Sequence, residues 1–252
     1  TAAAASSGAD SGSGGSGGSE AAGGRKRPAS SRFIVGFSGF DPNDPALARM
    51  RKWVGTHGGE VADTADRLHA CTHVVLTTPL KRTVKLMIAV SLGDAILVTD
   101  DWLHACETSG TFVDPDPYRL SGRQASAAGA AGTAWSFDAT SSRKRAAERR
   151  FLEGRRVFLS DKVKPKPSEL KLVVEAAGGS VLARAPKKAD AEADADHDAE
   201  TQPVLVVTTD DERSVWAPLA KQRHVVCIRA EHFLSCVLSQ ELKLGAAHVL
   251  KA

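Results

Sequence analysis

Short apolar runs alternate with segments in which apolar residues recur every three or four positions. A short apolar run between turn residues is typical of a buried strand, and the wider spacing is typical of an amphipathic helix. In the first half, the predicted elements are a strand at 33–37, a helix from Pro45 to the Gly58-Gly59 turn, strands at 60–62 and 73–76, a helix at 82–92, a strand at 96–98 and a helix from Asp101 to Gly110. This order predicts an α/β domain.

The second half repeats the order. Its predicted elements are a strand at 157–159, a helix that ends at Gly178-Gly179, strands at 180–182 and 204–207, a shorter helix at 213–221, a strand at 225–227 and a helix from Glu231. The two Gly-Gly turns fall at matching places. We therefore predict an internal duplication, with two α/β domains of about 90 to 100 residues each.

Regions outside this pattern define the domain boundaries. Residues 1–31 are rich in Ala, Gly and Ser, and we expect a disordered linker because little in them is apolar enough to offset the entropy of ordering. We place the first repeat at 32–119, an inter-repeat linker with a helix at 120–154, and the second repeat at 155–250. Six acidic residues in 189–200 predict a solvated insertion at 187–202.

The composition excludes few classes of function. The net charge of +3 is too small to indicate a general nucleic-acid binder, and no stretch reaches the ~20 apolar residues of a membrane span. The four cysteines form no CxxC pair and each lies in or beside an apolar run, so we expect buried free thiols in a reducing compartment. The first residue is Thr, and we expect the sequence to be part of a longer protein.

Two stretches together suggest an anion-binding pocket. Ser38 and Gly39 close the first predicted strand, and Thr83 and Lys85 lie near the start of the helix at 82–92. A hydroxyl, a backbone N–H left accessible by glycine, an ammonium group and the free N–H groups of a helix start all suit a phosphate. Each charge-assisted contact contributes roughly 1.5–3 kcal/mol, so loss of one is expected to lower affinity about tenfold or more.

The element order, the Gly-Gly turns and Asp101-Trp102-Leu103 at the start of a helix resemble the BRCT family, and two such repeats resemble a tandem BRCT module over roughly residues 33–249. Phe233 stands where the second repeat would carry tryptophan. The resemblance implies two small parallel four-stranded sheets flanked by helices, packed in tandem through a helical linker. It also implies phosphoserine-peptide binding through Ser38, Gly39 and Lys85, and a nuclear adaptor without catalytic activity in the DNA damage response.

In similar modules, an arginine at the position of Arg82 contacts the third residue after the phosphoserine or its free carboxylate. This favours a histone-variant tail of the form pSer-Gln-acidic-aromatic, with the aromatic end in a groove between repeats. Met87 and Pro165 are candidates for that groove. The second repeat has Asp161 where the pocket would need glycine, so we expect a single phosphate site.

Other kinds of site are less well supported. His69, Cys71 and His73 could share one face of a strand, but a tetrahedral metal site needs a fourth ligand and none lies nearby in sequence. No nucleotide-binding glycine motif or catalytic arrangement is present, so we expect no cofactor and no enzyme. A phosphate-independent scaffold remains an alternative. So does a DNA-end or poly(ADP-ribose) binder with weak nucleic-acid contacts through Lys81, Arg82 and the run 143–150.

Overall fold

A computed structural model describes residues 33–126, 134–187 and 202–251. The predicted disordered segment 1–31 and nearly all of the acidic insertion lie outside these residues. In the first repeat the elements are β1 (Ile34–Ser38), α1 (Pro45–Thr56), β2 (Glu60–Val61), the 3₁₀ helix η1 (Ala65–Ala70), β3 (His73–Leu76), α2 (Val84–Leu92), β4 (Ile96–Thr99), α3 (Asp101–Ser109) and the 3₁₀ helix η2 (Asp116–Tyr118). All the predicted helices and strands of this half are confirmed, and the 3₁₀ helices are additional.

The second repeat has the same architecture. Its elements are β7 (Arg156–Leu159), α5 (Pro167–Ala176), β8 (Ser180–Val181), β9 (Val204–Thr208), the 3₁₀ helix η3 (Asp210–Glu212), α7 (Arg213–Leu219), β10 (Val225–Arg229) and α8 (Ala230–Ser239). The strands are parallel, in the order β2-β1-β3-β4 in the first sheet and β8-β7-β9-β10 in the second. The predicted fold class, two α/β repeats with parallel four-stranded sheets, is therefore confirmed.

The linker contains more structure than its sequence predicts. Before the predicted linker helix, β5 (Arg123–Ala125) pairs antiparallel with β6 (Ser136–Asp138). The following helix α4 (Ala139–Glu148) begins before the basic run, because the Asp138 carboxylate accepts a hydrogen bond from the Ser141 N–H at 2.6 Å. Both differences depend on pairing and capping interactions that apolar spacing does not reveal.

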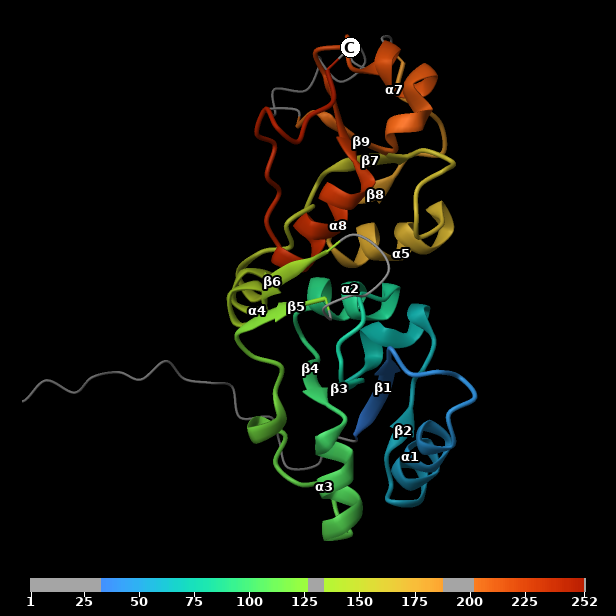
Figure 1. The fold of residues 1–252 in the computed structure, drawn as a ribbon, viewed down its shortest axis with the longest axis vertical. Helices are drawn as coiled ribbons and strands as arrows, with labels where there is room; N and C mark the ends of the chain where they lie inside the picture. The colour runs from blue at the N-terminus through green and yellow to red at the C-terminus, as the bar shows by residue number, and fades with distance from the viewer. Residues whose placement is uncertain (1–32, 127–133, 188–201, 252) are drawn as a thin grey trace, which may run out of the picture. The chain divides into compact units, whose positions relative to one another are not determined.

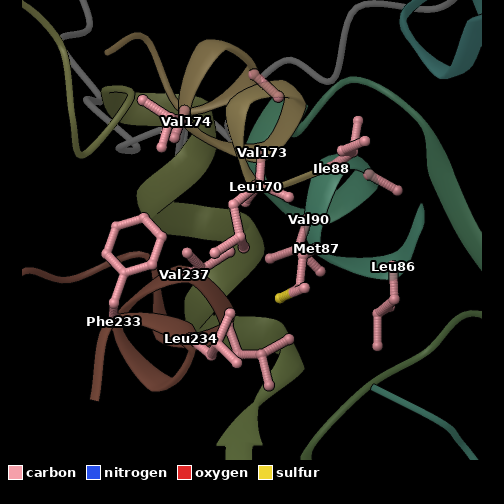
Figure 2. Close-up of a cluster of buried hydrophobic side chains, with 14 of the residues drawn as sticks. Leu86, Met87, Ile88, Val90, Leu170, Val173, Val174, Phe233, Leu234 and Val237 are labelled. Carbon is pink, nitrogen blue, oxygen red and sulfur yellow. The ribbon is translucent and has the colours of Figure 1, made fainter. Parts of the chain in front are cut away.

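Three helices, α2 of the first repeat and α5 and α8 of the second, lie between the two sheets (Figure 1). Their apolar faces form one continuous core, in which α2 supplies Leu86, Met87 and Ile88, α5 supplies Leu170, Val173 and Val174, and α8 supplies Phe233, Leu234 and Val237 (Figure 2). Polar contacts also join the repeats here, since the Gln240 side chain donates to the Ser91 hydroxyl at 3.1 Å. This core places the N-terminal end of α2 beside the second repeat.

The core includes the aromatic residues near the starts of α3 and α8, and the predicted burial of the cysteines is confirmed. Trp102 and Phe233 are fully buried, and the Trp102 ring stacks on His73 with centroids 4.7 Å apart. All four cysteines are buried free thiols, and burial raises the pKa of Cys71 and Cys227 to about 11. None of the helices among the described residues is both long and apolar enough to span a membrane.

Candidate functional site

The end of β1 meets the start of α2. Ser38, the last residue of β1, is buried, and its hydroxyl lies 2.5 Å from the hydroxyl of Thr83. Thr83 caps α2, because its side-chain oxygen accepts a hydrogen bond from the Leu86 N–H at 3.1 Å. The structure thus brings together two hydroxyl groups that are 45 residues apart in the sequence, directly at a helix N-terminus.

Gly39 occupies a backbone position that only glycine fits easily. Its φ is +92°, in the region that L-residues rarely adopt. A Cβ at this position would also lie 2.4 Å from the Thr77 Cγ2 atom, closer than any real contact of this kind. The turn after β1 therefore needs a glycine, which keeps the backbone accessible on the side that faces the pocket.

Lys85 is the second residue of α2, and its side chain reaches β1. Its ammonium group donates to the Phe37 carbonyl at 3.0 Å and to Asp63 Oδ1 at 2.5 Å. The other oxygen of the Asp63 carboxylate accepts from Arg51 of α1, and Asp63 Oδ1 accepts from the Phe37 N–H at 3.3 Å. Asp63 thus holds both cations at the end of β1.

Sequence reasoning missed Arg51 and Asp63. Arg51 lies on an amphipathic helix among other charged residues, and Asp63 follows a two-residue strand, so neither belongs to a recognisable motif. Both line the same pocket as Gly39, Thr83 and Lys85, which has a volume of about 440 Å³. The two cations of the lining, Arg51 and Lys85, lie together at this end, while the second carboxylate of the lining, Glu169, comes from α5 of the other repeat.

Arg82 lies beside this pocket but faces the second repeat. Its guanidinium donates two parallel hydrogen bonds to the Glu231 carboxylate at the start of α8, at 2.8 and 2.9 Å. The Arg82 side chain is only 14% exposed, compared with 46% for Glu231. Since guanidinium has five N–H donors, the remaining ones can still bind another acceptor while Glu231 fixes the plane of the group.

The two candidates for the inter-repeat groove differ. Pro165 is half-buried in the loop before α5, where a peptide could reach it. Met87 is fully buried in the core between the repeats, where it packs with the apolar faces of α5 and α8 (Figure 2). The expectation that Met87 lines the groove is therefore wrong for this structure, because α2 turns that face toward the core.

In the second repeat, the serine that corresponds to Ser38 contacts an acidic side chain of the same repeat. Ser160 follows β7 as Ser38 ends β1, but its hydroxyl donates to the carboxylate of Glu212 in η3. Glu212 also accepts hydrogen bonds from the hydroxyls of Thr208 and Thr209 and from the Lys162 N–H at 3.2, 3.0 and 3.2 Å. Glu212 directly precedes α7 as Thr83 directly precedes α2, so a carboxylate contacts the serine in the second repeat where a hydroxyl contacts it in the first.

The protonation state of Glu212 follows from these contacts. Burial raises the pKa of its carboxyl group, but the hydrogen bonds from Ser160, Thr209 and the Lys162 backbone outweigh burial and hold the pKa below its ordinary value. The group is therefore an anion at neutral pH. Asp161, which the sequence suggested as the obstacle to phosphate, is exposed and forms no part of this cluster.

The three residues considered as metal ligands do not form a metal site. His69 lies on η1 and bonds to a backbone carbonyl, Cys71 is buried, and the His73 ring stacks on Trp102. Within residues 33–126, 134–187 and 202–251, no group of three or more His, Cys, Asp or Glu side chains could hold a metal ion.

Comparison with curated proteins finds relatives of much greater length. PAX-interacting protein 1 of Bos taurus is 32% identical over 159 residues, which cover 63% of this chain and 15% of that protein. Mediator of DNA damage checkpoint protein 1 of Homo sapiens is 28% identical over 196 residues, covering 78% of this chain and 8% of that protein. The chain therefore spans less than a sixth of either relative.

Solved structures have the same fold. The BRCT5-BRCT6 domains of S. pombe Brc1 match with a TM-score of 0.61 at 21% identity, covering 85% of this chain and 95% of that one. Rtt107p, solved in complex with phosphorylated histone H2A, matches with a TM-score of 0.54 at 10% identity, covering 86% of this chain and 92% of that one.

Family comparison agrees with the duplication seen in the structure. The family described as BRCA1 C Terminus (BRCT) domain matches residues 31–107, and the family described as BRCT domain matches residues 150–245. Each match falls on one of the two parallel sheets and its helices. The chain therefore belongs to the BRCT family and contains two BRCT domains in tandem.

Proposed function

We propose that this chain binds phosphoserine peptides through the first repeat. The observation that carries the proposal is the convergence of Ser38, Gly39, Thr83 and Lys85 at the junction of β1 and α2. A phosphate there would accept hydrogen bonds from a hydroxyl and a backbone N–H, next to a helix N-terminus and an ammonium group. Binding is the only activity in this proposal, so the module acts as an adaptor without catalytic activity.

We further propose that the third residue after the phosphoserine binds at Arg82. Glu231 holds the guanidinium in one plane and leaves further N–H groups for a second carboxylate. A ligand ending at this residue would present its free C-terminal carboxylate to Arg82. Pro165, in the loop before α5, is a candidate to contact the aromatic side chain of such a residue.

The biological setting is part of the same proposal. Rtt107p has been solved with phosphorylated histone H2A, and one relative is named as a mediator of the DNA damage checkpoint. Together with the pocket, these support a nuclear role in the DNA damage response, reading a phosphorylated histone-variant tail of the form pSer-Gln-acidic-aromatic.

Calorimetric titration with one peptide in four forms tests the proposal. The peptide carries pSer or Ser, each with a free or an amidated C-terminus three residues later. We expect tight binding only for the phosphorylated free acid. Equal binding of the phosphorylated acid and amide would contradict the Arg82 role. Binding without phosphate dependence would contradict the phosphate pocket and favour a phosphate-independent scaffold.

A further inference from the structure

The pocket at the end of β1 is larger than a phosphate needs. Its volume is about 440 Å³. A phosphate group has roughly the volume of two or three water molecules, each of which takes up ~30 Å³. Most of the pocket is therefore left for another part of the ligand.

The remaining lining is mostly apolar and comes from both repeats. Phe40, Pro42 and Leu47 line it from the first repeat, and Leu172 of α5 lines it from the second. The Phe40 ring packs edge-on against Phe37, with centroids 6.0 Å apart, so this wall is continuous with the core below β1. We call this part of the pocket the apolar crevice.

Two carboxylates, those of Glu169 and Asp63, lie in the same pocket as the apolar crevice. Glu169, at the first turn of α5, lines the pocket and is held in place because its carboxylate accepts from the Lys166 N–H at 3.1 Å. Asp63 also lines the pocket, and its carboxylate accepts hydrogen bonds from Lys85 and Arg51. An apolar side chain suits such a wall, whereas an acidic side chain would lie near Glu169 without a free cation beside it.

The position of Arg82 indicates which ligand residue enters the crevice. Neither Arg82 nor its partner Glu231 lines the pocket. Under the proposed function, the peptide runs from the phosphoserine toward Arg82 in its C-terminal direction. The chain on the other side of the phosphoserine is therefore the one beside Phe40, Pro42 and Leu172.

We infer that the apolar crevice is a second specificity site, which binds an apolar side chain immediately before the phosphoserine. This inference rests on the proposed function, because the phosphate anchors the peptide. It adds a requirement at the preceding position, with contributions from Leu47 and Phe40 of one repeat and Leu172 of the other. Burying roughly half of a leucine side chain is expected to strengthen binding about fivefold compared with glycine.

The test is a titration of three phosphopeptides that differ only before the phosphoserine, where they carry Leu, Gly or Asp. Each is titrated into wild type, Leu172→Ala and the control Lys171→Ala, which changes an exposed neighbour on the same helix outside the pocket. Wild type and Lys171→Ala are expected to prefer Leu over Gly about fivefold and to bind Asp most weakly. Leu172→Ala is expected to reduce the Leu preference to about twofold or less while it binds the Gly peptide as wild type does.

The outcomes separate the two proposals. Tight binding of all three peptides without a preference, or a Leu preference that Leu172→Ala leaves intact, would overturn the crevice and leave the phosphate pocket standing. No binding of any phosphopeptide by folded wild type would overturn the proposed function and the crevice with it. Thermal unfolding of each variant verifies that Leu172→Ala, which touches the edge of the core, is still folded.

Discussion

The two repeats share a strand order and a serine at the end of the first strand, but this serine contacts different side chains in the two repeats. In the first repeat Ser38 pairs with Thr83, beside a pocket lined by Lys85. In the second, Ser160 binds the internal carboxylate of Glu212. The same fold thus pairs this serine with a neutral hydroxyl in one copy and with a carboxylate in the other. Strand order alone therefore does not decide which groups surround the end of the first strand.

The largest expected effect is the difference in peptide affinity between two lysine substitutions, one in each repeat. Lys85→Met removes the ammonium group from the proposed site and is expected to weaken phosphopeptide binding tenfold to a hundredfold, corresponding to roughly 1.5–3 kcal/mol. Lys162→Met, which removes an exposed pair with Asp211 in the second repeat, is expected to leave affinity unchanged. Calorimetry on both variants measures the difference. Equal losses would mean that both repeats bind the peptide.

The turn after β1 is the next point of contrast. Gly39→Ala forces a side chain into positive φ and onto Thr77, so the free energy of unfolding is expected to fall by roughly 2 kcal/mol or more. Gly58→Ala is the matched control, because Gly58 also has positive φ but open space around its Cβ. Denaturant unfolding should show a smaller loss for the control, of about 1 kcal/mol. If the two losses are equal, the contact with Thr77 has no energetic weight.

The role of Glu212 in the second repeat is tested by the pH dependence of the free energy of unfolding. Glu212→Gln puts an amide among donors that need an acceptor, and it is expected to lower the free energy of unfolding at pH 7 by about 1–3 kcal/mol. The folded-state pKa of Glu212 lies below its ordinary value of 4.5, so its carboxylate stabilises the fold above pH 4.5. That stabilisation is lost as the pH falls through the folded-state pKa.

Stability curves of wild type and Glu212→Gln should therefore converge at acid pH. Asp161→Asn, a change at the exposed neighbour, is the control and should follow wild type at every pH. A constant gap between wild type and Glu212→Gln down to pH 3 would show that the difference comes from packing rather than from the charge of Glu212.

The smallest effect concerns the ion pair between the repeats. Arg82→Gln breaks a pair whose carboxylate is nearly half exposed, so screening limits the loss of stability to about 0.5–1 kcal/mol. Its sharper readout is selectivity: the variant should bind the free-acid and amidated phosphopeptides equally. A preserved preference for the free acid would place the carboxylate at another residue.

Several features were predictable from the sequence because they depend on local patterns. Apolar spacing and the glycine turns predicted the strands and helices of both repeats, and the order of elements predicted the duplication. Ser38, Gly39, Thr83 and Lys85 could be proposed together because they stand at the ends of predicted elements.

Other features depend on residues that are far apart in the chain, and only the tertiary structure decided them. Asp63 joins Lys85 and Arg51, Glu231 holds Arg82 across 149 residues, and Glu212 reaches Ser160 across 52. Met87 faces the core rather than the groove, because α5 and α8 cover that side of α2. The sequence by itself determined the duplicated α/β architecture and the candidate phosphate residues, since periodicity and turn chemistry act locally. Which serine contacts a carboxylate, and which cations a carboxylate already holds, was decided by packing that brings distant groups together.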